Sequence, residues 1–260
     1  MEVITMLLTI DIGNTNITLG MFKGDELCFV SRLATQRVRT RDEYAFEMLN
    51  MFNLNSLDPK QCKAAIISSV VPEITRDIGS AVKLTTGCTP KYIDQNIRTD
   101  LKIATQIPGQ LGADMVVGSV AAIDKYPLPC LVIDLGTANK MFVIDNSGTF
   151  LGCTISAGIG LSLNALSSGA SQLPAINIKA PEKTIGTETV SCMQSGTVYG
   201  TACMIDGMIE RFEKELGYSF SSIIATGGYA KPIVKHCKRE ILYDDNLLLD
   251  GLKSIYYKNV

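Results

Sequence analysis

Apolar residues along the chain occur in short runs or alternate with polar ones, and glycine, proline and polar clusters separate these segments. This pattern predicts an alternation of strands and helices. Strands are predicted at residues 6–10, 16–22, 26–32, 64–71, 91–93, 130–133, 141–144, 149–156 and 223–226. Helices are predicted at residues 41–52, 73–85, 112–123, 160–168, 191–216 and 245–257. Thr40 and Glu43 form a capping-box pattern that starts the first helix.

Two strand ends carry the same polar pattern. Residues 11–16 read Asp-Ile-Gly-Asn-Thr-Asn, and residues 134–139 read Asp-Leu-Gly-Thr-Ala-Asn. Each segment follows one apolar strand and precedes another. The repeat indicates two related α/β halves that face one cleft.

The residue types in these turns suit a metal–phosphate group. Glycine accepts positive φ and adds no side-chain bulk, so successive N–H groups can point at an anion. The aspartate at the strand end can hold a metal, directly or through water. One such turn alone is better explained as a structural hairpin. Two copies, together with the strand end Thr226-Gly227-Gly228, favour nucleotide-phosphate chemistry, with the two glycines allowing a base or sugar to lie against the backbone.

Composition disfavours several other classes of protein. The 260 residues carry a net charge of −2, so no basic field attracts nucleic acid. The basic run at residues 32–41 precedes Asp42 and Glu43 and is interpreted as a solvated loop and helix face. Eight cysteines show no metal-ligand spacing and indicate a reducing compartment. No apolar run approaches the roughly 20 residues that span a bilayer, and no leader pattern begins the chain. We therefore expect a cytoplasmic protein.

Six sequence blocks resemble those of the type III pantothenate kinases. They are D-I-G-N-T-N, S-S-V-V-P, L-G-A-D, D-L-G-T-A, M-Q-S-G-x-x-x-G and A-T-G-G, and they occur in the family's order. The resemblance implies two duplicated ribonuclease H-like α/β domains of the actin-like ATPase fold around a nucleotide cleft, at residues 1–112 and 113–260. It also implies ATP-dependent phosphorylation of pantothenate to 4′-phosphopantothenate, the first step of coenzyme A synthesis, by a homodimer. The expected cofactors are ATP, a divalent metal such as Mg²⁺, and a monovalent cation, K⁺ or NH₄⁺.

The resemblance also assigns roles to residues. Asp11 would orient metal and phosphate, and Asp134 would bind the monovalent cation or support the metal–phosphate site. Asp114 would be the general base, at a helix N-terminus that favours its ionised form; the alternative is a helix-capping carboxylate without substrate contact. The ATP-binding residues would be Gly13, Asn14, Thr15, Asn16, Gly136, Thr137, Ala138, Gly227 and Gly228. The pantothenate site would use Gly112, Ala113, Asp114 and, from the neighbouring subunit, Thr189.

Two positions depart from the family pattern. Met115 stands where the family has arginine, and Lys140 stands where it has threonine. Methionine cannot replace the donor fork of a guanidinium. Lys140 either places a cation near the phosphate or monovalent-ion site, or turns to solvent. These departures leave open a weaker pantothenate kinase, a changed acceptor or a non-catalytic nucleotide-binding paralogue. An actin-like assembling ATPase is a further alternative, disfavoured by the short chain.

Overall fold

The computed structural model describes residues 6–260, and contacts within it divide the chain into two compact units. Unit 1 contains the described residues up to 101 together with residues 107–124 and 247–260. Unit 2 contains residues 102–106 and 125–246. The expectation that no leader begins the chain concerns residues that include 1–5, and these lie outside the described residues. Each unit is built on its own sheet.

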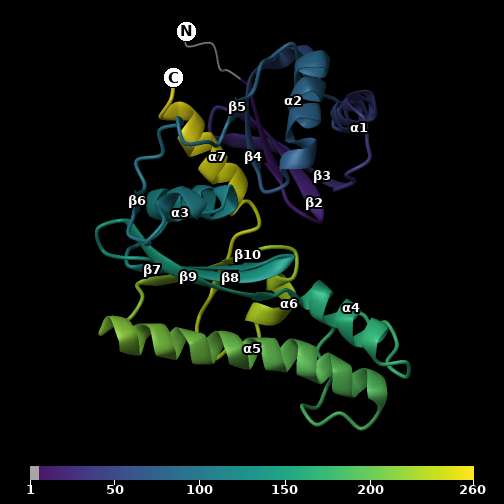
Figure 1. Cartoon of the computed structure of the whole chain (residues 1–260), viewed down its shortest axis with the longest axis vertical. Helices are drawn as coiled ribbons and strands as arrows, with labels where there is room; N and C mark the ends of the chain where they lie inside the picture. Colours follow the sequence, from purple (N-terminus) through teal and green to yellow (C-terminus); the bar gives the residue numbers. More distant parts are fainter. Residues whose placement is uncertain (1–5) are drawn as a thin grey trace. The chain divides into compact units, whose positions relative to one another are not determined.

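Unit 1 contains a five-stranded sheet with the strand order β3-β2-β1-β4-β5 (Figure 1). β1 is antiparallel to β2 and parallel to β4. The strands of this sheet are β1 (Met6–Ile12), β2 (Asn16–Lys23), β3 (Glu26–Ala34), β4 (Cys62–Ser69) and β5 (Lys91–Tyr92). The helices are α1 (Arg41–Leu54), α2 (Pro72–Thr86), α3 (Ala113–Lys125), α7 (Leu247–Tyr257) and the short 3₁₀ turns η1 (Pro59–Gln61) and η2 (Pro108–Gln110).

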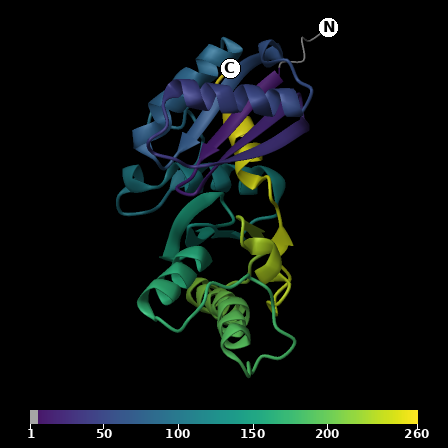
Figure 2. The same cartoon turned by 90° about the vertical axis from the view of Figure 1, so that its right-hand side faces the viewer.

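Alternation along β1 sends apolar side chains to both faces of this sheet. Leu8 and Ile10 pack with α1 and α2 on one face. Leu7 packs with α3 and α7 on the other. In Figure 2, α1 lies in front of these strands and the yellow α7 lies behind them. The predicted capping box is present at the start of α1, where Glu43 N–H donates to Thr40 Oγ1 and Thr40 N–H donates to Glu43 Oε2.

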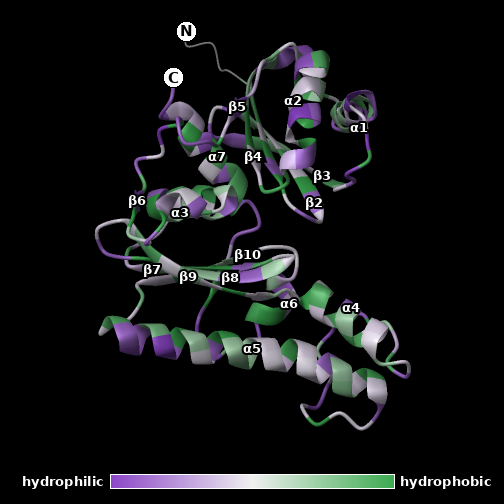
Figure 3. Cartoon of the chain, in the orientation of Figure 1, coloured by the Kyte–Doolittle hydropathy of each residue, from purple (hydrophilic) through white to green (hydrophobic). Residues whose placement is uncertain are grey.

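Unit 2 contains a six-stranded sheet with the order β11-β10-β7-β8-β9-β6. Its strands are β6 (Lys102–Ile103), β7 (Cys130–Leu135), β8 (Ala138–Ile144), β9 (Thr149–Ala157), β10 (Ser222–Thr226) and β11 (Leu242–Tyr243). Its helices are α4 (Ile159–Gly169), α5 (Thr189–Leu216) and α6 (Ala230–Val234). α5 and α6 cover the face that carries Leu131, Ile133 and Leu135. In Figure 3, hydrophobic green residues occur along the strands of each unit and also on helices such as α6.

The two sheets repeat one topology. β7 is antiparallel to β8 and parallel to β10, as β1 is to β2 and β4. Read from β9, the order β9-β8-β7-β10-β11 therefore matches β3-β2-β1-β4-β5. β6 is an added edge strand beside β9. This duplication confirms the α/β class and the repeat inferred from the two Asp-x-Gly turns.

The grouping of helices adds a feature that the sequence did not indicate. α3 and α7 both follow the predicted boundary at residue 112, yet they cover the unit 1 sheet. Val117 and Val120 of α3 and Leu252 of α7 share a cluster with Leu7 of β1. The division at residues 112/113, drawn between the two copies of the fold, stays a prediction. None of the helices between residues 6 and 260 has the length and apolarity that crossing a bilayer requires.

Candidate active site

The first Asp-Gly turn joins β1 to β2 in unit 1. Gly13 N–H donates to the Asn16 carbonyl at 2.9 Å, which closes the turn. Asn14, Thr15 and Asn16 are exposed at its tip, and Asp11 is half-buried two residues before it. The sequence therefore places neutral donors and a carboxylate at one end of the central strand pair, as the phosphate-turn interpretation predicts.

Residues that follow β3 form hydrogen bonds with this turn. Thr35 Oγ1 donates to the Gly13 carbonyl at 2.7 Å, and Thr35 N–H donates to the Thr15 carbonyl at 2.9 Å. Arg37 Nη2 lies 3.4 Å from Asn14 Oδ1. The sequence interpretation of residues 32–41 as a solvated loop and helix face missed this contact, because it joins residues 23 positions apart. Elsewhere in the run the interpretation holds: Arg41, for example, is half-exposed and pairs with Asp42.

Asp11 shares its sheet face with a buried hydroxyl. Pairing aligns Asp11 with Thr18 of β2 and Ser68 of β4. Ser68 is fully buried, and its Oγ has no hydrogen-bond partner among residues 6–260. A buried hydroxyl without a partner costs about 1–3 kcal/mol. A ligand or water beside Asp11 would remove that cost.

Asp114 lies in the first turn of α3, the helix that covers the same face of the sheet. Its Oδ1 accepts a 2.8 Å hydrogen bond from Met115 N–H. A Cβ at Gly112 would come within 2.7 Å of this oxygen, so a larger residue there would have to displace the carboxylate. The structure thus brings Gly112, Ala113 and Asp114 to the α3 N-terminus, on the face of the sheet that carries Asp11. The Asp114 carboxylate therefore does cap the helix. Its role as a general base stays a prediction.

The second Asp-Gly turn joins β7 to β8 in unit 2. Gly136 N–H donates to the Ala138 carbonyl at 3.3 Å, and Gly158 N–H donates to the Thr137 carbonyl at 3.1 Å. Gly158 caps α4, and a Cβ there would collide with the Gly136 and Thr137 carbonyls. Gly158 could not be singled out from the sequence, since Thr137, its partner in space, lies 21 residues earlier.

Asp134 is held from two sides within unit 2. Its Oδ2 lies 2.6 Å from Lys140 Nζ, and both side chains are 13% exposed. Gly227 has φ +96°, and a Cβ there would come within 2.7 Å of Asp134 Oδ1 and 2.6 Å of the Leu135 carbonyl. Gly228 is exposed with open space beside its Cβ position. The two predicted glycines therefore differ: Gly227 fits closely against the turn, and Gly228 leaves room beside it.

Sequence comparison places the chain among known proteins. The family model described as type III pantothenate kinase matches residues 7–211. The chain belongs to this family. The type III pantothenate kinase of Exiguobacterium sp. is 37% identical over 254 residues, covering 98% of this chain and 99% of that protein. The one from Finegoldia magna is 40% identical over 252 residues, covering 96% of each chain.

Solved structures support the same fold. A Baf family transcriptional activator from Campylobacter jejuni superposes with a TM-score of 0.62 at 18% identity, covering 97% of this chain and 98% of that one. Component A of the Acidaminococcus fermentans (R)-2-hydroxyglutaryl-CoA dehydratase superposes with a TM-score of 0.58 at 14% identity, covering 98% of both chains. At identities of 18% and 14%, these two superpositions show that the folds are alike and say nothing about the activity of this pantothenate kinase family member.

The two departures from the pantothenate kinase pattern have different surroundings. Met115 is 7% exposed, and its Cε lies 3.6 Å from the Cβ position of Gly112. The side chain at this position is therefore an apolar contact in the L-G-A-D turn. Lys140 does not turn to solvent, because its ammonium contacts Asp134. This decides between the two orientations that the sequence left open.

Thr189 is the first residue of α5 and is exposed. Its predicted contact with pantothenate in a neighbouring subunit stays a prediction. Between residues 6 and 260 no three His, Cys, Asp or Glu side chains gather as a metal cluster.

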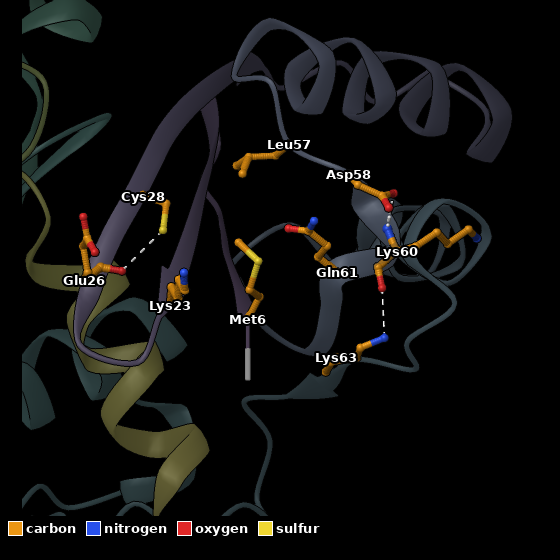
Figure 4. A pocket seen from close by; sticks show the side chains of 9 residues that line it. All are labelled: Met6, Lys23, Glu26, Cys28, Leu57, Asp58, Lys60, Gln61 and Lys63. Carbon is orange, nitrogen blue, oxygen red and sulfur yellow. Dashed lines mark hydrogen bonds between the residues drawn. The ribbon is translucent and has the colours of Figure 1, made fainter. Parts of the chain in front are cut away.

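A hollow in unit 1 is unrelated to these turns. Met6, Lys23, Cys28 and Lys63 are among the residues that line it (Figure 4). Met6 begins β1, whereas Asp11 is near its other end. At about 3.3 Å per residue the two positions are roughly 16 Å apart. We therefore do not include this hollow in the candidate active site.

Proposed function

We propose that the chain transfers the γ-phosphoryl group of ATP to the primary hydroxyl of pantothenate, yielding 4′-phosphopantothenate and ADP. Family membership over nearly the whole chain supports the reaction. The structural observation that supports it best is the position of Asp114. Its carboxylate lies at the N-terminus of α3, on the sheet face that carries Asp11.

The two Asp-Gly turns are the proposed ATP-binding elements. In unit 1 the ATP phosphates would contact Gly13, Asn14, Thr15 and Asn16. In unit 2 they would contact Gly136, Thr137 and Ala138, and the adenosine would lie along Gly228, whose surface is open. Backbone amides in such turns bind anions because their N–H groups converge. That both turns bind one ATP stays a prediction, and a substitution in either turn should then weaken ATP binding.

Asp11 fits the divalent metal that ATP-dependent phosphoryl transfer requires. Mg²⁺ is usually held by one or two carboxylates, phosphate oxygens and waters. The half-buried Asp11 carboxylate offers one such ligand, and the unpartnered Ser68 hydroxyl beside it would hold a metal-bound water. When bound, the metal supplies neutralisation of charge on the phosphates.

Asp114 is the proposed general base. The pantothenate hydroxyl would hydrogen-bond to its carboxylate, which accepts the proton as the hydroxyl oxygen bonds to the γ-phosphorus. The bond between that phosphorus and the β,γ-bridging oxygen breaks, and ADP leaves with the electron pair. The hydrogen bond from Met115 N–H to Oδ1 fixes the carboxylate against the helix end. The chain thereby positions the base before substrate binds.

A product assay tests this reaction. The full chain is incubated with ATP, Mg²⁺, K⁺ and pantothenate, and phosphopantothenate is measured by mass. We expect product with the wild type and none with Asp114→Asn. A panel of other hydroxyl acceptors runs in parallel, so that product from another acceptor identifies a changed substrate. Nucleotide binding without product from any acceptor would overturn the proposal in favour of a non-catalytic paralogue.

We further propose that the protein is a homodimer. Leu161 and Leu166 of α4 are 49% and 46% exposed, and Ile155 of β9 is 62% exposed. Such apolar side chains on neighbouring elements suit burial against a second copy. A cytoplasmic location is proposed because all eight cysteines are free thiols, which suits a reducing compartment.

A further inference from the structure

Lys140 and Asp134 form a cross-strand pair in the second turn. They are direct partners in the antiparallel pairing of β7 and β8, and the ammonium lies 2.6 Å from Oδ2. Each side chain is only 13% exposed. Water therefore screens this pair weakly, and removal of either partner would leave a buried charge.

The other carboxylate oxygen faces glycine backbone. The Cβ positions of Gly136 and Gly227 lie 3.4 Å and 2.7 Å from Asp134 Oδ1. The protein thus surrounds both oxygens: two turns pack beside Oδ1, and the ammonium contacts Oδ2. The cation that contacts this carboxylate therefore belongs to the chain itself.

The first turn provides an internal comparison. In the pairing of β1 and β2, Asp11 faces Thr18, a neutral hydroxyl. In the pairing of β7 and β8, the aspartate of the second copy faces Lys140. The duplicated hairpins therefore place a hydroxyl and an ammonium at matching positions. The second copy thus carries a positive charge where the first carries a neutral hydroxyl.

These residues do not fit a monovalent cation at Asp134. K⁺ needs several oxygen ligands, whereas lysine supplies none and adds a like charge within hydrogen-bond distance of the carboxylate. We propose that Lys140 Nζ acts as a tethered cation at Asp134, so that the enzyme works without K⁺ or NH₄⁺. This inference rests on the proposed kinase function.

The test compares cation responses of the full chain at constant ionic strength. Phosphopantothenate formation is measured with K⁺, NH₄⁺ or tetramethylammonium as the monovalent cation. We expect the wild-type rate to change by less than about twofold among them. Lys140→Thr should lose activity in tetramethylammonium and regain at least about tenfold with K⁺. Lys140→Arg keeps the charge and should stay insensitive to K⁺, and Lys214→Thr, at an exposed site on α5, is the matched control.

A binding readout separates this inference from the proposed function. Thermal unfolding is measured with K⁺ or tetramethylammonium, without substrates. We expect a K⁺-specific rise in Tm for Lys140→Thr and none for the wild type, because a ligand stabilises the state that binds it. Strong K⁺ activation or K⁺-specific stabilisation of the wild type would overturn the tethered-cation inference. Absence of product in every salt would overturn the kinase function, and the Tm comparison would still decide the role of Lys140.

Discussion

Thr35 Oγ1 donates a 2.7 Å hydrogen bond to the Gly13 carbonyl, 22 residues earlier in the chain. Together with the hydrogen bond from Thr35 N–H to the Thr15 carbonyl, it ties the first turn to the residue that follows β3. Because the carbonyls of Gly13 and Thr15 are hydrogen-bonded to Thr35, the backbone of the turn is fixed. The amides that would face phosphate belong to the same backbone. A preorganised anion site needs this rigidity, because its donors must be in place before the ligand arrives.

Thr35→Val should therefore weaken ATP binding more than it weakens the fold. Valine keeps the shape and loses the hydroxyl, which costs about 1 kcal/mol of stability. We expect a several-fold rise in the KM for ATP with little change in the KM for pantothenate, measured by initial rates. Thr197→Val removes a comparable bond within α5 and serves as the control. Equal effects of the two variants on ATP would show that Thr35 has no particular role in the turn.

Much of the framework could be predicted from the sequence because it depends on local patterns. Hydrophobic periodicity gave the long strands and helices, and the repeat of Asp-x-Gly gave the duplicated hairpins that the topology confirms. β6 and β11 were not predicted, whereas the equally short β5 was; two residues show no period, so periodicity does not distinguish these cases. The packing of α3 on the unit 1 sheet was also not predicted, since it depends on contacts with α7, which is distant in the sequence.

Fewer details of the candidate site could be predicted from the sequence. Asp11, Gly13 and Asp134 were identified from a motif, but their partners were not. Thr35 is far from Gly13 in sequence and occurs in no motif. The direction of Lys140 depends on the strand register that places it opposite Asp134, and register is a property of the folded sheet.

The hydrogen bond from Met115 N–H to Asp114 Oδ1 predicts a separation of catalysis from nucleotide binding. Asp114→Asn retains an oxygen that accepts the Met115 N–H and loses only the basic carboxylate. We expect phosphoryl transfer to fall by about two orders of magnitude or more, with ATP affinity nearly unchanged in a binding titration. A parallel loss of ATP affinity would contradict the assignment of Asp114 as base.

Gly112→Ala tests the position of the same carboxylate sterically. The new Cβ would come within 2.7 Å of Asp114 Oδ1 and should displace the carboxylate, lowering kcat without removing it. Gly109→Ala, in the same connecting segment, meets nothing closer than 4.0 Å and should behave as wild type. Similar kcat values for the two variants would mean that the position of the Asp114 carboxylate does not matter.

The adjacent glycines after β10 should respond differently to alanine. Gly227 has positive φ and abuts Asp134, so Gly227→Ala should destabilise the chain by about 1–2 kcal/mol from backbone strain alone. Gly228→Ala meets open space and should leave the free energy of unfolding nearly unchanged. Urea unfolding measures both. If Gly228 lines the adenosine site, its variant should instead raise the KM for ATP.

The pair of Arg239 and Glu213 makes stability depend on pH. Hydrogen bonds from Arg239 hold the pKa of Glu213 below its usual 4.5. Because the folded pKa is the lower one, the stabilisation is complete above the unfolded pKa and is lost as pH falls through the folded value. Arg239→Gln should reduce stability at pH 7 by about 1.5–3 kcal/mol and flatten its decline on acidification. Arg98→Gln removes an exposed pair with Asp100 and should have little effect in the same unfolding titrations.

The exposed leucines of α4 predict how the subunits associate. Leu161→Glu with Leu166→Glu would place charges on a surface that we expect a second copy to bury, so light scattering should show a monomer. If Thr189 reaches pantothenate in the neighbouring subunit, the monomer should also lose pantothenate phosphorylation while each chain keeps its fold by circular dichroism. Leu54→Glu, at an 85% exposed position at the end of α1, controls for added charge and should remain a dimer. A variant in α4 that stays dimeric and active would show that this helix face does not form the interface.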